Sequence, residues 1–287
     1  MAETLRDLVE AELDQPVDER VSAMAVAIAA QHGAASRAVL FYGSCLREKQ
    51  LEGLMLDFYL IVSDYSAAYD KGWLARANAL VPPNVFPFQH EGLAAKYAVL
   101  SERDFYRLNG PETRNVSVWA RFAQPSRLVW SANQQARTAA VAAVARSAPT
   151  LLAAAGRIGG EQPLDWWRRA FALTYSAELR AERKGRAISV VDADLERYGR
   201  FSRPVIAAID PAIPGGGWIR RRIEGKLLSV VRLAKASATY AGGAEYITWK
   251  INRHAGTNIE LKPWQKRHPL LAAISLLPRL LRSRAIR

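Results

Sequence analysis

The sequence predicts an α+β protein, with a mixed sheet and helices first, a mostly helical domain next and a basic amphipathic segment last. In residues 1–132, short apolar runs rich in β-branched and aromatic residues alternate with helical patterns. Residues 133–215 are rich in Ala and in aromatic residues at helical spacing, whereas residues 216–287 are strongly basic. We therefore expect a sheet-containing domain at 1–132, a helical domain at 133–215 and a basic C-terminal region at 216–287.

Two apolar runs, residues 38–42 and 54–62, predict adjacent buried strands joined by a polar linker. The first run ends at Gly43 and Ser44, and the second contains one charge, Asp57. An unpaired charge inside an apolar strand costs several kcal/mol. Asp57 is therefore either a strand-edge residue satisfied by a neighbouring Arg or amide, or a ligand for a cation. In the second case Gly43 lets the backbone approach a phosphate, Ser44 donates to it and Asp57 coordinates Mg²⁺.

The remaining elements follow from periodicity and from turn residues. Pro82 and Pro83 end a short helix, and Ser101 with Asp104 three residues later is typical of a helix N-terminus. Helices are expected over residues 3–31, 70–80, 134–156, 164–183 and 189–200, a loop or edge strand over 85–90, and a third strand over 95–100.

Two basic residues are candidates for phosphate contacts. Lys96 lies in the third predicted strand, where it is either a solvated strand-edge charge or a group that neutralises a triphosphate. The turn at Gln124 and Pro125 is placed to present Arg121 to the same face.

Charge and cysteine content bound the partners and the compartment. The chain carries 40 Lys and Arg against 27 Asp and Glu, a formal charge of +13, which favours a polyanionic partner such as nucleic acid or an anionic membrane. The single cysteine, Cys45, excludes an intrachain disulfide and is consistent with a reducing compartment. The acidic segment 1–19 has the pattern of neither a signal peptide nor a transit peptide. We expect a cytoplasmic protein, peripheral at the inner face of the membrane.

The C-terminal region has the pattern of an interfacial helix with a Trp anchor. Its apolar face and basic residues suit reversible contact with an anionic membrane surface, where each basic residue contributes about 1 kcal/mol. A terminal helix docked on the protein's own core is the alternative. The Leu-rich face argues against nucleic acid as the partner. The predicted membrane-contacting residues are Trp264, Leu270, Leu271, Ile274, Leu277, Arg279, Leu281 and Arg282.

Several motifs, in the same order and with similar spacing, resemble those of a known family. Gly-Ser followed by an apolar-flanked Asp is the outline of polymerase-β-like nucleotidyltransferases. More closely, the chain resembles the mitochondrial-type, peripheral phosphatidate cytidylyltransferases, or CDP-diacylglycerol synthases, over residues 39 to about 255. The matching blocks are Phe41-Tyr42-Gly43-Ser44, Met55-Leu56-Asp57-Phe58, Val62-Ser63-Asp64, Lys96-Tyr97-Ala98-Val99-Leu100-Ser101, Ala120-Arg121 with Gln124-Pro125, and Leu173-Thr174-Tyr175-Ser176 with Arg180.

The resemblance implies a polymerase-β-like nucleotidyltransferase domain that uses Mg²⁺ to convert CTP and phosphatidic acid, or a related anionic phospholipid, to CDP-diacylglycerol and pyrophosphate. It implies catalytic roles for Asp57, Lys96 and Arg121, nucleotide binding by Gly43, Ser44, Tyr97 and Arg180, and metal binding by Asp57 with Asp64 or Glu52. Cys45, Tyr59 and Gln124 depart from the patterns of these enzymes. Two alternatives therefore stay open: a nucleotidyltransferase that acts on RNA or protein, and a non-catalytic lipid-binding relative.

Overall fold

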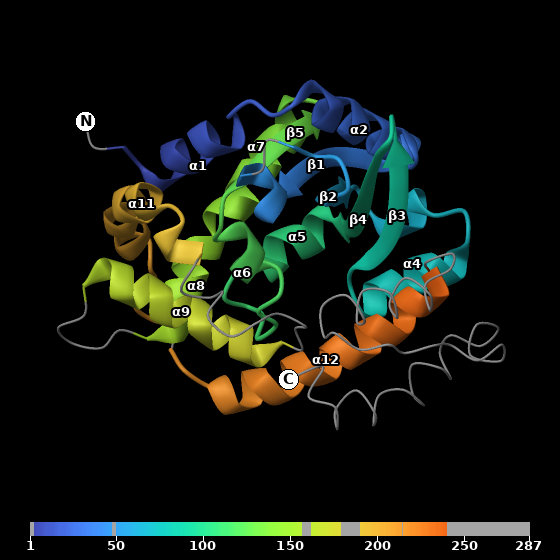
Figure 1. The fold of residues 1–287 in the computed structure, drawn as a ribbon. Coiled ribbons are helices and arrows are strands. Elements are labelled where there is room, and N and C mark those ends of the chain that lie inside the picture. Colours follow the sequence, from blue (N-terminus) through green and yellow to red (C-terminus); the bar gives the residue numbers. More distant parts are fainter. Residues whose placement is uncertain (1–2, 48–49, 157–161, 179–189, 214, 240–287) are drawn as a thin grey trace.

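The computed structural model describes residues 3–47, 50–156, 162–178, 190–213 and 215–239 (Figure 1). Its centre is a five-stranded mixed sheet in the order β3-β4-β2-β1-β5. Only β2 and β4 run parallel among these neighbours, and the other pairs are antiparallel. The α+β class predicted from the sequence is thus confirmed. The strands are β1 (Ser36–Tyr42), β2 (Met55–Val62), β3 (Asn84–His90), β4 (Leu93–Ser101) and β5 (Ser126–Ser131).

The helices cover both faces of this sheet and extend away from it on one side (Figure 1). Short 3-10 turns follow the second helix at Gly33–Ala35 and the first strand at Ser44–Arg47. The helices are α1 (Leu5–Leu13), α2 (Glu19–Ala30), α3 (Tyr65–Ala68), α4 (Gly72–Leu80), α5 (Glu102–Leu108), α6 (Trp119–Phe122), α7 (Gln134–Ala145), α8 (Ser147–Ala155), α9 (Pro163–Ala177), α11 (Leu195–Ala207) and α12 (Trp218–Thr239).

Alternation along the strands sends side chains to two cores. On one face, Leu40, Tyr59 and Leu100 pack with residues of α1, α5 to α9 and α11. On the other, Phe58 and Val99 pack against α2 and α3. Because the first core contains residues from both 1–132 and 133–215, the two predicted domains share it.

Local signals explain most element boundaries, and some predicted boundaries shift. The helix expected over 3–31 is two helices, α1 and α2, separated around Pro16, which has no backbone N–H to continue the ladder. Ser101 caps α5 by accepting from the backbone N–H of Asp104, as predicted. The helix expected over 189–200 is interrupted: residues 190–192 are helical, residues 193–194 form a turn, and α11 begins at Leu195, where Asp194 provides the N-cap.

The Ala-rich segment Gln134–Ala155, which comprises α7 and α8, is the one described helical segment long and apolar enough, by length and composition, to cross a membrane. However, 67% of its most apolar window is buried inside the protein, where it contributes Val141, Val144 and Leu151 to the first core. This burial is the pattern of a core helix.

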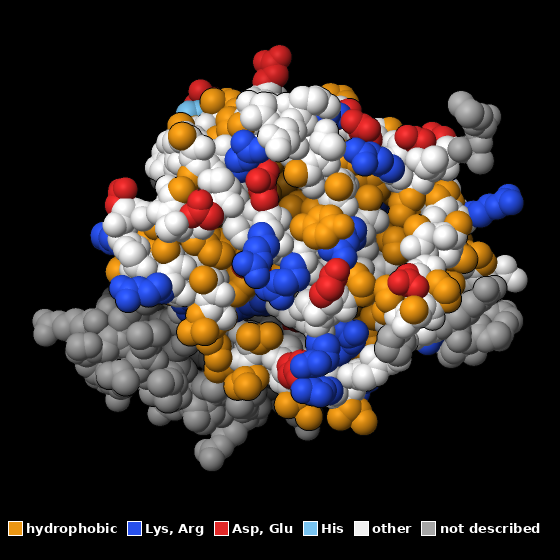
Figure 2. All heavy atoms as spheres, turned by 180° about the vertical axis from the view of Figure 1, so that it is seen from behind, with side chains coloured by type: hydrophobic (Ala, Val, Ile, Leu, Met, Phe, Trp, Pro, Cys, Tyr) orange, Lys and Arg blue, Asp and Glu red, His pale blue; other side chains and the backbone are white. Residues whose placement is uncertain are grey.

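The last described helix, α12, passes beneath α9 and runs toward α4 and β3 (Figure 1). Gly225 makes the close approach to α9 possible, because a Cβ there would lie 2.2 Å from the carbonyl oxygen of Ala177. Figure 2 shows the molecule from behind, where Lys and Arg side chains lie beside acidic side chains and between hydrophobic patches.

Candidate functional site

Three neighbouring strands place a row of polar side chains on one face of the sheet. Asp57 of β2 is the direct partner of Tyr42 in β1 and of Lys96 in β4. Directly opposed residues in a sheet have Cβ atoms about 5 Å apart, so their side chains interact. Lys96 Nζ lies 2.8 Å from Asp57 Oδ1. The carboxylate is thus satisfied by a basic neighbour, but this neighbour is Lys96 rather than the expected Arg or amide, and Asp57 lies within the central strand β2 rather than at a strand edge.

The turn after β1 brings backbone close to this carboxylate. Gly43 has a φ of 96°, a conformation that residues with a Cβ rarely adopt. A Cβ at this position would lie 3.4 Å from Asp57 Oδ2. The glycine thus provides the tight turn and leaves space beside the second carboxylate oxygen.

Arg121 approaches the row from α6, above the same face of the sheet. Its guanidinium donates to the carbonyl oxygen of Ser117 and lies 3.7 Å from the buried carboxylate of Glu178. Burial lowers the pKa of Arg121, but Glu178 and then Tyr59 and Tyr42 raise it, and the net pKa lies above the ordinary value. Arg121 is a permanent cation at this place, and its predicted position on the face of Lys96 is confirmed.

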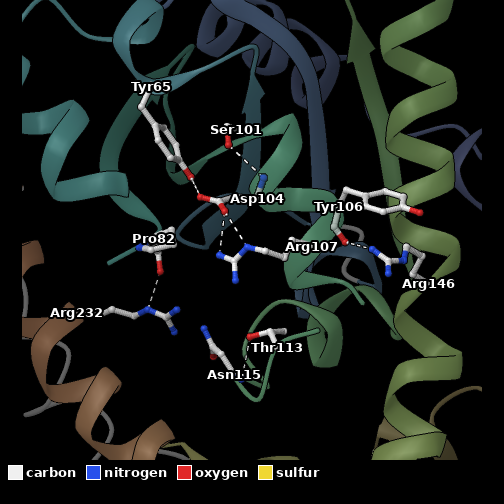
Figure 3. Close-up of polar contacts among 10 residues, drawn as sticks. All are labelled: Tyr65, Pro82, Ser101, Asp104, Tyr106, Arg107, Thr113, Asn115, Arg146 and Arg232. Carbon is white, nitrogen blue, oxygen red and sulfur yellow. Dashed lines mark hydrogen bonds and ion pairs between the residues drawn. The ribbon is translucent and has the colours of Figure 1, made fainter. Parts of the chain in front are cut away.

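Helix α12 supplies two further cations, Arg232 and Lys235. They are three residues apart and therefore share a helix face. Arg232 donates from Nε to the carbonyl oxygen of Pro82, 2.9 Å away, and from Nη1 to Ser117 Oγ, 2.8 Å away (Figure 3 shows the first contact). Lys235 Nζ donates to the carbonyl oxygens of Val81 and, at 2.8 Å, of Pro83. Sequence reasoning assigned these two residues only to the basic C-terminal region.

A cavity of about 160 Å³ lies between the sheet, α6 and α12. It exceeds the ~10–15 Å³ that one water requires and is smaller than the ~300 Å³ of pockets that enclose a whole drug-sized ligand. Four basic side chains line it beside two tyrosines and several apolar groups. The lining residues are Tyr42, Phe58, Tyr59, Pro83, Val85, Lys96, Ala98, Ser117, Arg121, Arg232 and Lys235.

Burial and like charges perturb the titration of this lining. Burial, and then the neighbouring Arg232, lowers the pKa of Lys235 to about 7. Burial also lowers the pKa of Arg232; Tyr59 and Glu178 oppose this shift, and Arg121 adds to it. The pKa of Tyr42 is raised well above its ordinary value by burial and then by Asp57, so its hydroxyl remains protonated. Burial thus disfavours the charged forms of Lys235 and Arg232, a condition that an incoming anion relieves, whereas Arg121 stays charged.

The three carboxylates predicted as metal ligands do not lie together. Asp64 follows the opposite end of β2, seven residues or about 23 Å along the strand from Asp57, and its side chain caps α3. Glu52 pairs with Arg20 at 2.5 Å. Within the described ranges, no group of three His, Cys, Asp or Glu residues is placed to hold a metal ion.

The donors near the cavity do not fit a Mg²⁺ held by the protein. Such an ion needs oxygen ligands in near-octahedral geometry. Asp57 offers one carboxylate, whose Oδ1 already pairs with Lys96. Tyr59, two residues along β2 and on the same face, is buried and packs against Tyr42 and Phe122.

The other predicted nucleotide-binding residues have different positions. Tyr97 points to the opposite face of the sheet from Lys96, because successive strand residues alternate, and its hydroxyl lies 3.3 Å from His32 Nε2. Tyr97 is therefore not among the residues that line the cavity beside Lys96, and its nucleotide-binding role stays a prediction. Ser44 is exposed in the turn after Gly43. Arg180 and all the predicted membrane-contacting residues, from Trp264 to Arg282, lie outside the described residues.

Comparisons with known proteins give a likeness of fold only. No protein-family model matches the sequence, and no curated protein sequence matches it. Among solved structures, the chain is similar to a nucleotidyltransferase-like protein from Exiguobacterium sibiricum 255-15, with 11% identity and a TM-score of 0.30. The match covers 93% of this chain and 77% of that chain. A likeness of this degree carries no argument about the reaction, which must be argued from the cavity.

Proposed function

We propose that this protein is a nucleotidyltransferase that transfers CMP from CTP to phosphatidic acid or a related phospholipid, giving CDP-diacylglycerol and pyrophosphate. One observation carries the proposal: Lys96, paired with Asp57, meets Arg121, Arg232 and Lys235 around one cavity. Cations converging on one small space suit a phosphate chain. The choice of CTP and of the phospholipid comes from the motifs in the sequence.

The residues fit a reaction that depends on positioning and on charge neutralisation. An oxygen of the acceptor phosphate attacks the α-phosphorus of the nucleotide, and the bond from that phosphorus to the bridging oxygen breaks. Pyrophosphate leaves with the electron pair. A phosphomonoester is anionic at neutral pH, so the attack requires no general base. Lys96, Arg121 and Arg232 would hold the phosphates in line and stabilise the charge on the leaving group.

An apolar stripe on α12 supports a lipid acceptor and a peripheral membrane location. Four large hydrophobic side chains, each four residues from the next, are exposed along one side of this helix, although the helix also carries many basic residues. A helix with these properties suits the boundary between headgroups and acyl chains of an anionic membrane. The stripe consists of Ile219, Ile223, Leu227 and Val231.

The experiment is the release of pyrophosphate from CTP, in a buffer with MgCl₂, on vesicles with and without phosphatidic acid. We expect release that requires phosphatidic acid and is abolished by Asp57→Ala, which leaves Lys96 without its ion-pair partner. A circular dichroism spectrum and a melting curve of the variant check that it is folded. Release that is equal without phosphatidic acid contradicts the lipid acceptor, and full activity of the folded variant contradicts the assigned site.

A second candidate is a non-catalytic protein that binds phosphorylated lipids. The observation that favours it is the shortage of carboxylates for a metal ion. Asp57 is already paired with Lys96, and the residue two positions along the strand is Tyr59 rather than a second acid. This candidate predicts vesicle binding that depends on phosphatidic acid and on Arg232, with no release of pyrophosphate. The same vesicle assay therefore separates the two functions.

A further inference from the structure

We infer that the cavity binds the phosphate chain of its nucleotide through cationic side chains alone, so that binding requires no divalent metal ion. The inference rests on the proposed function for the identity of the ligand. It goes beyond that function because it assigns Arg232 and Lys235 of α12, together with Lys96 and Arg121, the charge neutralisation that metal ions supply at many phosphoryl-transfer sites.

The first argument is the balance of charge around the cavity. Asp57 compensates Lys96 at 2.8 Å, and Glu178 lies 3.7 Å from Arg121. Arg232 donates to the Pro82 carbonyl oxygen and to the Ser117 hydroxyl, which are neutral groups. Glu178 raises the pKa of Arg232 as well as that of Arg121, so two cations share this carboxylate, and burial still leaves the pKa of Arg232 below its ordinary value. A partly buried cation held by neutral groups keeps a desolvation cost that an anion offsets. The triphosphate group of a nucleotide brings several negative charges to the cavity.

The second argument is the origin of the cations. Arg232 and Lys235 reach the cavity only because α12 packs at Gly225 against α9 and then crosses to residues 81–83. Their hydrogen bonds to backbone carbonyl oxygens fix the two side chains before any ligand arrives. Such preorganised cations bind phosphate oxygens without the loss of side-chain freedom that flexible surface lysines incur.

The third argument is the size and the donor set. The volume of about 160 Å³ suits phosphate groups but not a whole nucleotide, so the base and ribose extend beyond the cavity. In the part of the chain that the structure covers, the carboxylates and histidines form no group of three suited to a metal ion. Oxygen acceptors of the ligand therefore meet nitrogen donors of the protein directly.

The test is equilibrium binding of CTP and of inorganic tripolyphosphate to the full chain, measured by titration calorimetry in EDTA and again in excess MgCl₂. We expect both probes to bind in EDTA. Arg232→Gln weakens this binding by about tenfold to a hundredfold, the effect of losing one charged hydrogen-bond donor. Arg222→Gln is the matched control, since Arg222 is an exposed arginine of the same helix, and it binds like the wild type.

The outcomes separate the inference from the proposed function. Binding in EDTA that Arg232→Gln weakens and Arg222→Gln leaves intact supports the inference. Binding of CTP only in MgCl₂ overturns the metal-independent site but leaves a nucleotide-binding protein. Absence of binding in both buffers overturns the proposed function as well. Equal loss in both variants shows general electrostatic attraction and also overturns the assigned site.

Discussion

Lys96 and Asp57 are direct partners in the parallel strands β4 and β2, their side chains form an ion pair of 2.8 Å, and Lys96 lines the cavity. Both side chains are about one-quarter exposed, at 25% and 24%. The pair therefore has a double role. It satisfies the one charge inside an otherwise apolar strand, and it fixes the lysine where a phosphate would be bound.

This pair predicts measurable coupling between the two residues. In a double-mutant cycle of Asp57→Asn and Lys96→Met, we expect a coupling free energy of about 1 kcal/mol, above that of exposed pairs and below that of fully buried ones. Urea denaturation of the four proteins measures it. The pair of Arg168 and Asp165 on α9, in which Asp165 is 55% exposed, is the control cycle and should give a smaller value. Additive effects at Asp57 and Lys96 would contradict the assigned interaction.

Gly43 and Gly53 form a matched pair for testing the turn beside Asp57. Both have positive φ, 96° and 73°, so Ala at either position should lower the free energy of unfolding by about 1–2 kcal/mol. Only the methyl group at position 43 would lie against Asp57 Oδ2, since nothing lies within 4 Å of a Cβ at position 53. We therefore expect Gly43→Ala alone to weaken binding of tripolyphosphate, measured by calorimetry. Equal binding by the two variants would separate the turn from the site.

The strands around Asp57 could be predicted because their apolar runs are short, rich in aromatic and β-branched residues, and bounded by turn residues. The sequence also identified Lys96 and Arg121. The prediction for Tyr97 did not take into account that side chains alternate between the two faces of β4. If Lys96 points to one face of the sheet, Tyr97 must point to the other. The separation of Asp64 from Asp57 has a different origin, because Asp57 lies near the start of β2 whereas Asp64 follows its other end and caps α3.

The contribution of α12 could not be predicted, because its basic residues lie on several sides of the helix. Only the close approach at Gly225 and the contacts to residues 81–83 select Arg232 and Lys235 from them. These are tertiary contacts across more than a hundred residues, as between Arg232 and Ser117. The spacing of Arg232 and Lys235 predicts that they share one face of a helix, but it does not predict which part of the protein that face packs against.

The buried bridge between Glu12 of α1 and Arg197 of α11 predicts a large stability effect. Arg197 Nη2 lies 2.8 Å from Glu12 Oε1, and both side chains are less than one-tenth exposed. Glu12→Gln leaves a buried guanidinium without its counter-charge, so we expect the free energy of unfolding to fall by about 3–5 kcal/mol. Denaturant unfolding measures the loss. Glu10→Gln, at a 42% exposed residue of the same helix, should cost less than about 1 kcal/mol. A small loss at Glu12 would contradict the burial of this ion pair between α1 and α11.

Lys235 predicts how stability depends on pH. Its folded pKa of about 7 lies below the ordinary value of 10.5, because burial and then Arg232 disfavour the charged form. Between these two pH values the unfolded chain binds more protons, so the free energy of unfolding rises with pH, with a slope of at most one proton. The penalty is complete below pH 7 and disappears as pH rises toward 10.5. In Lys235→Met this rise is absent, whereas Lys226→Met, at an exposed lysine of the same helix, keeps it. Urea denaturation across this range measures the slope, and equal slopes in the wild type and Lys235→Met would contradict the shifted titration.

The same titration governs anion binding at the cavity. A bound phosphate favours the charged form of Lys235, so tripolyphosphate should bind with uptake of a proton above pH 7, and its affinity should fall as pH rises from about 7 to about 9. Calorimetry in two buffers of different ionisation enthalpy measures the proton uptake. Lys235→Met should bind more weakly at pH 7 and show a smaller pH dependence, since the titrating ammonium is gone and Arg121 is a permanent cation. A wild-type affinity that is constant with pH, or a variant that keeps the full dependence, would show that Lys235 does not contact the anion.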